Sequence, residues 1–132
     1  MSQSIVSVFP DIESALLFAL VPLEPDIRFV TVLPTGDQPE IVARIHRIAG
    51  AGRDIYIDRP IVDIDVFGTK ADVGLVSDAA RRIQAHILSF ASTIVSNGVI
   101  QHANTIAGPR PIPEPNPAYV RYSASYEIQI HA

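Results

Sequence analysis

Cysteine is absent from all 132 residues of this chain. That absence excludes a disulfide framework and any metal site built from thiolates, and it is compatible with a reducing compartment. Packing must therefore stabilise the fold. A chain of this length can bury roughly two thirds of its unfolded surface, so we expect a single domain over residues 1–132.

Long hydrophobic runs are also missing. The first ten residues, MSQSIVSVFP, lack the basic start and the long apolar core of a signal peptide. No later run approaches the length of about 20 apolar residues that spans a bilayer. We therefore expect a soluble protein that is not exported by a signal peptide and does not enter a membrane.

Charged residues are scarce for a small protein. They make up 18% of the chain against 48% hydrophobic residues, and the net charge is -4. The ten Lys and Arg are scattered rather than gathered in a stripe, which argues against a nucleic-acid binder. So few charges leave apolar surface on a free monomer, and we expect other chains to cover part of it.

A strand followed by a long amphipathic helix forms the centre of the sequence. In the strand RPIVDIDVFG, which begins at Arg59, every second side chain is aliphatic, whereas Asp63 and Asp65 point to the opposite face. In the segment after Thr69, apolar residues recur at steps of three and four, as on one side of a helix. They are Val76, Ala80, Ile83, Ile87, Phe90 and Ile94. The aliphatic strand face and this helical stripe can bury each other.

The remaining periodic segments complete an α+β order of αβββαββ. We expect a helix from Asp11 to Leu20 and a closing strand from Tyr119 to His131, which alternates most regularly. Other strands are expected over residues 28–33, 41–48 and 99–107, with the second of these antiparallel to the first, although a short helix beginning at Pro39 remains an alternative there. The sequence thus predicts a mainly antiparallel sheet with two helices packed on one face.

Two segments break the periodic pattern. Residues 49–59 contain two glycines, four charges and the apolar cluster of Ile55, Tyr56 and Ile57, and we expect a mobile loop there. Its apolar residues either fold back onto their own domain or order against a partner. Residues 108–118 contain five of the eleven prolines and are expected to run as an extended connector outside the sheet interior.

No motif in the chain predicts an enzyme. Asp63 and Asp65 share a strand face, and paired carboxylates can hold a divalent metal, but a solvated or inter-subunit face is the simpler interpretation, because no third ligand is evident. The four histidines are isolated, and no nucleophile frame or phosphate loop is present. We therefore expect no catalytic residue, no cofactor and no metal.

Residues 59–68, the Ala-rich helix after them, Gly108-Pro109 with its proline connector, and the terminal strand YVRYSASYEIQI together resemble tail terminator proteins of long, non-contractile-tailed bacteriophages. The likeness covers nearly the whole chain and rests on length, element order and hydrophobic pattern. It implies a structural subunit that forms a hexameric ring on the finished tail tube, stops its polymerisation and provides the surface that joins the head.

The resemblance also implies partners and surfaces. The partners are further copies of this chain, the major tail tube protein and a head-completion or stopper protein, while DNA only passes through the lumen. Candidate contacts with copies or with the tube are Arg53, Asp54, Ile55, Tyr56 and Ile57, and candidate lumen-facing residues are Asp63 and Asp65. Six copies at -4 total -24, a charge that repels DNA. Such a protein assembles in the host cytoplasm and ends at the head-proximal end of the virion tail.

Three alternatives remain open from the sequence. A head-closure or connector subunit of the phage neck has similar size but binds the portal. A small ferredoxin-like ligand-binding domain needs a polar pocket, which the sequence does not indicate. A metal-dependent hydrolase would use Asp63 and Asp65.

Overall fold

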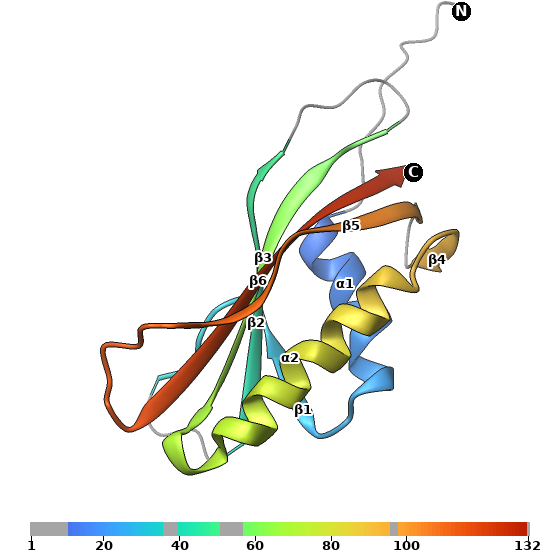
Figure 1. The fold of residues 1–132 in the computed structure, drawn as a ribbon. Helices are drawn as coiled ribbons and strands as arrows, with labels where there is room; N and C mark the ends of the chain where they lie inside the picture. Colours follow the sequence, from blue (N-terminus) through green and yellow to red (C-terminus); the bar gives the residue numbers. More distant parts are fainter. Residues whose placement is uncertain (1–10, 36–39, 51–56, 96–97, 132) are drawn as a thin grey trace, which may run out of the picture.

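The computed structural model describes residues 11–35, 40–50, 57–95 and 98–131, which form an α+β domain with one curled sheet (Figure 1). The helical elements are α1 (Ile12–Leu20), the 3-10 turn η1 (Val21–Leu23), the 3-10 turn η2 (Lys70–Asp72) and α2 (Val73–Leu88). The strands are β1 (Ile27–Val30), β2 (Ile41–Gly50), β3 (Pro60–Thr69), β4 (Thr93–Val95), β5 (Gly98–Ile112) and β6 (Tyr119–His131).

The sheet is mixed rather than antiparallel throughout. Its strand order is β1-β2-β3-β6-β5-β4, and all neighbours are antiparallel except β1 and β2, which run parallel. The expected antiparallel pairing of the first two strands is therefore wrong. The parallel pairing is possible because β1 has only four residues, so the ten residues between β1 and β2 need to retrace only about 13 Å, well within their reach.

The core lies between one face of the sheet and both helices. Val62, Ile64 and Val66 of β3 are buried against α2, as the alternation predicts. The buried residues of α2 are Val76, Ala79, Ala80, Ile83 and Ile87, and those of α1 are Ile12, Ala15, Leu16 and Leu20. One continuous cluster contains both groups, so the two helices share one face of the sheet.

The predicted helix is too long at its C-terminal end. α2 stops at Leu88, and Ser92 has a positive φ of 61°, which turns the chain into β4. Phe90 remains in the core, but Ile94 lies in β4 and is 77% exposed. The extra strand makes the order αβββαβββ. Helical spacing alone did not reveal this break, because Phe90 and Ile94 continue the apolar period beyond the end of the helix.

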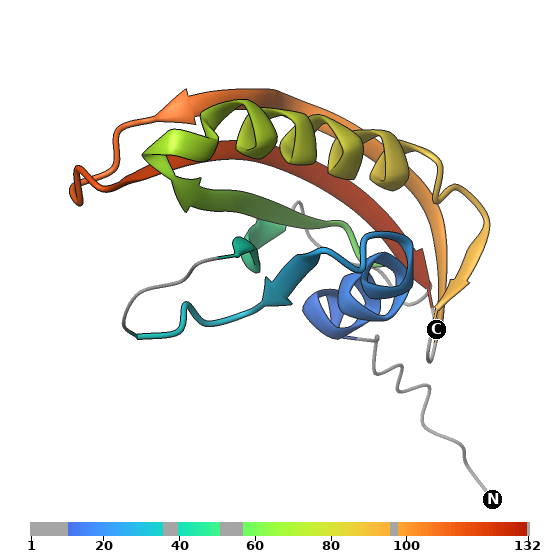
Figure 2. The same ribbon diagram turned by 90° about the horizontal axis from the view of Figure 1, so that it is seen from below.

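The sheet curls around α1. This helix packs against β2, near one sheet edge, and against β4 at the opposite edge. Figure 2 shows β5 and β6 bending along their length, with α2 lying along the bend. A flat sheet would not bring both edge regions to the same short helix, so the contacts of α1 define the curvature.

The proline-rich segment enters the sheet at its first half. β5 continues through Gly108 to Ile112, and Arg110, Pro111 and Ile112 pair with β6. The expected connector over residues 108–118 is thus wrong up to Ile112. Proline is tolerated there because, among the described residues, β4 covers only residues 98–100 of β5, so the rest of this strand lies at a sheet edge, the position in a sheet that accepts proline.

No helix among the described residues is long and apolar enough to cross a membrane.

Candidate interaction surfaces

The first candidate surface is the segment between β2 and β3. Arg53, Asp54, Ile55 and Tyr56 lie outside the described residues, and Ile57 is half-buried. The flanking chain belongs to the sheet: β2 runs to Gly50, which pairs with Pro60 of β3. β2 therefore ends and β3 begins at the end of the sheet where β6 also ends (Figure 1).

Asp58 fixes the base of this connection. Its backbone N–H and C=O both bond to Ile130 of β6, at 2.9 Å each. Its carboxylate, only 8% exposed, pairs with the guanidinium of Arg47 at 3.1 Å and accepts a bond from the N–H of Arg59. The N–H of Arg47 in turn donates to Glu13 of α1 at 2.9 Å. Asp58, which follows the candidate contact residues in the chain, is thus tied to β2 and β6, and through Arg47 to α1.

The second candidate surface is the face of the sheet that carries no helix. Asp63 and Asp65 both point to this face, as predicted, but each carboxylate has its own partner. Ser125 Oγ donates to Asp63, and Arg44 pairs with Asp65 at 2.6 Å. The Asp65 side chain is only 5% exposed. The two acids do not converge on one ligand position, and the described residues contain no group of three or more acids or histidines suited to a metal ion.

A groove of about 440 Å³ opens on the same face. Phe67 lies in its lining between the guanidiniums of Arg44 and Arg121, each 5.9 Å from the ring centroid, a geometry that favours cation–π attraction. Arg121 also bonds to the carbonyl of Pro113. Prolines, Leu33 and Tyr119 complete a mixed apolar and charged lining.

Sequence reasoning missed this grouping of Arg44, Phe67 and Arg121. Period-two alternation places each of them on the helix-free face, but they come from three strands. Only the pairing register, in which Phe67 lies opposite Val42 and Arg121, brings them together. No local signal in the sequence sets that register.

The third candidate surface consists of the two sheet edges, where large apolar side chains are exposed. Val32, just after β1, is 78% exposed, and Ile94 in β4 is 77% exposed. Ile106 in β5 is 54% exposed. These residues agree with the expectation that few charges leave apolar surface on the monomer.

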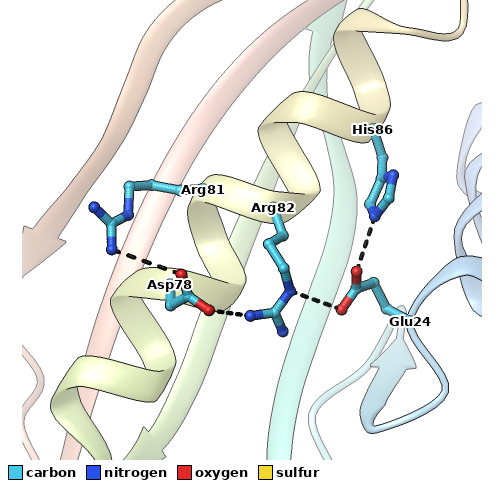
Figure 3. A network of polar contacts seen from close by, with 5 residues as sticks. All are labelled: Glu24, Asp78, Arg81, Arg82 and His86. Carbon is cyan, nitrogen blue, oxygen red and sulfur yellow. Dashed lines mark hydrogen bonds and ion pairs between the residues drawn. The ribbon is translucent and has the colours of Figure 1, made fainter.

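A polar network joins the segment before β1 to α2 (Figure 3). Glu24 accepts from Arg82 at 3.0 Å and contacts His86 at 2.9 Å, and Arg82 also pairs with Asp78. Arg81 is 3.8 Å from Asp78. Because these contacts join elements of one chain, the network positions α2 over the sheet.

The network shifts the ionisation of its central groups. Burial is the largest influence on the pKa of the Glu24 carboxyl and raises it, but hydrogen bonds and positive charge from His86 and Arg82 outweigh burial, so this pKa lies below its usual value. Burial likewise lowers the pKa of Arg82, yet Glu24 and Asp78 more than compensate and the net pKa is raised. Glu24 is therefore an ionised partner at neutral pH.

Comparison with known proteins gives a structural likeness alone. No protein-family model and no curated protein sequence matches the chain. The fold is similar to that of a chain in the virion of a native gene transfer agent particle, with a TM-score of 0.63 and 12% sequence identity. The likeness covers 93% of this chain and 87% of that chain. At this identity it concerns the fold, which a component of a virion particle shares over nearly its whole length.

Proposed function

We propose that this protein is a structural subunit of a phage or phage-like virion. The observation that carries the proposal is the fold shared with a virion component over 93% of this chain. The surplus of exposed apolar side chains on the sheet edges supports it, because a subunit of an assembly covers such surface with its neighbours. The protein acts in this proposal by adhesion and not by catalysis.

Within that class we propose a tail terminator. Six copies form a ring on the end of the tail tube, stop its polymerisation and present the opposite rim to a head-completion protein. The resemblance of residues 59–68 and of the terminal strand to terminator proteins supports this more specific role. The protein then lies at the head-proximal end of the tail, where DNA passes through the ring.

Residues 53–57 are proposed to contact the tail tube or a neighbouring copy. The next residue along the chain, Asp58, bonds to Ile130 and Arg47, which supports a fixed attachment of this segment to the sheet. The helix-free face, with Asp63 and Asp65, is proposed to face the lumen. Arg44 neutralises Asp65 there, which leaves a face of mixed charge beside the DNA.

Native mass spectrometry and negative-stain imaging, with and without purified tail tubes, test the role. A closed ring that caps tube ends and halts tube growth is the expected result. A protein that stays monomeric at high concentration and does not bind tail tubes would refute the proposed role as a tail terminator. Binding to purified portal complexes in place of tubes would instead identify a head-closure subunit.

A triple variant with Ile55, Tyr56 and Ile57 changed to Ser tests the contact segment. It keeps Asp58 and its bonds, so the fold should persist while tube capping falls by at least about tenfold, the equivalent of 1.4 kcal/mol. Leu75→Ser is the matched control, because Leu75 is 58% exposed on α2, away from the segment. Unchanged capping by a folded triple variant would remove these residues from the interface, and loss of the folded state would show that they belong to the core.

A further inference from the structure

The outer edge of β5 is open and uncharged. β4 pairs only with residues 98–100, so from Gln101 onward this edge has no strand neighbour within the described residues. Residues 101–108 read QHANTIAG and contain no Asp, Glu, Lys or Arg. Open edges in monomeric proteins are usually protected by charge, proline or a covering element, because their free N–H and C=O groups accept a further strand. Here Pro109 and Pro111 protect only the end of the strand.

The opposite edge of the sheet has the same character. β1 is the terminal strand there, and residues 29–35, FVTVLPT, contain no charged side chain. Val32 in this segment is 78% exposed, the largest exposure among the large apolar side chains of the described residues, and Leu33 beside it is 37% exposed. Apart from Arg28 in β1, whose side chain pairs with Glu40, both edge regions of the sheet therefore carry uncharged chain with exposed aliphatic side chains.

We propose that the open edge of β5 pairs with the β1 edge of a second copy of this chain, so that one sheet continues from subunit to subunit. The proposal rests on the ring of the proposed function and names the surfaces that build it. Because the two edges have different sequences, the contact is heterologous, with residues 29–33 of one copy meeting residues 101–108 of the next. A heterologous contact repeated by rotation gives a closed ring when the rotation closes on itself.

The strand directions fit this pairing. With β1 and β2 parallel and every later pair antiparallel, β1, β2, β6 and β4 run one way while β3 and β5 run the other. A neighbouring copy that continues the sheet places its β1 in the first direction, beside β5 in the second. The new pair is antiparallel, which is the more stable arrangement per residue.

Cysteine cross-linking tests the proposal on a clean background, because the native chain contains no cysteine. The double variant Val32→Cys/Ile106→Cys places one thiol on each edge, and a short bis-maleimide bridges thiols that face each other across the contact. The expected result is a ladder of covalent oligomers that ends at the ring size seen by native mass spectrometry. Each single-cysteine variant should stop at the monomer, because like positions of neighbouring copies do not meet in a heterologous contact.

The control is Val32→Cys/Leu75→Cys, which moves the second thiol to an equally exposed site on α2. It should give no ladder. A ring that assembles while Val32→Cys/Ile106→Cys fails to cross-link would overturn the edge pairing and leave the proposed function standing. If no ring formed in concentrated protein or on tail tubes, both the edge pairing and the proposed tail-terminator function would be refuted.

Discussion

Replacement of Gly68 by alanine tests how tightly α2 is packed on the end of β3. A Cβ at this position would lie 2.4 Å from Cγ2 of Val76, closer than any real contact, and 3.8 Å from Ile41. Val76 is fully buried and its β-branched side chain has one favoured rotamer in a helix, so it cannot turn away at little cost. Overpacking of this kind costs about 1–3 kcal/mol. We therefore expect Gly68→Ala to lower the free energy of unfolding by that amount.

Equilibrium urea unfolding measures the loss, and two further variants sharpen it. Gly74→Ala is the matched control, because a Cβ there has no atom within 4 Å and alanine favours the helix, so stability should rise by up to about 1 kcal/mol. Val76→Ala alone loses roughly 2 kcal/mol through its buried methyl groups and the cavity they leave. In Gly68→Ala/Val76→Ala the new methyl fills part of that cavity, so the double variant should be at least about 1 kcal/mol more stable than additivity predicts. Strict additivity, or a Gly68→Ala protein as stable as the native one, would refute the close packing.

Two ionic contacts give further predictions. The pKa of Glu24 is depressed in the folded protein, so its contribution is fully present above the ordinary value of 4.5 and is lost as pH falls through the lower folded value. Glu24→Gln should therefore have a free energy of unfolding about 1–2 kcal/mol lower than that of the native protein at pH 7. As the pH is lowered to 3, the urea midpoints of the variant and the native protein should converge. A difference in midpoint that stays constant with pH would exclude ionisation of Glu24 as the cause. Arg44→Met leaves the Asp65 carboxylate buried and unpaired, so it should lower the free energy of unfolding, measured in urea, by about 2–4 kcal/mol. The double variant Arg44→Met/Asp65→Asn should recover at least about 1 kcal/mol of that loss. A double variant no more stable than Arg44→Met would show that the pair is not coupled.

The strand and helix at the centre of the chain were predictable from the sequence. The alternation of Val62, Ile64 and Val66 with Asp63 and Asp65 has the period of a strand with one buried face, and the structure buries the aliphatic side against α2. These elements follow from local periodicity because a single face of each is buried. The interface and lumen roles of Asp63, Asp65 and residues 53–57 remain predictions.

The direction of β1 and the pairing register of the strands were not predictable from local periodicity. A four-residue strand such as β1 carries no signal for parallel or antiparallel pairing, so its direction depends on the chain that follows. Pro109 and Pro111 suggested a connector because proline breaks a ladder in a sheet interior, whereas β5 is at an edge in this region. The grouping of Arg44, Phe67 and Arg121 depends on pairing between distant strands, which no window of sequence contains.

The bend of the sheet bears on the number of subunits in the proposed ring. α1 holds the sheet bent through its contacts with both β2 and β4, so each copy joined edge to edge is rotated by the same angle from the copy before it. In the proposed ring, that angle, divided into a full turn, would decide how many subunits meet before the last reaches the first. A substitution that weakens the packing of α1 against β2 and β4 would leave the sheet edges intact and still change the number of subunits in the ring. It could equally prevent closure of the ring and yield open filaments.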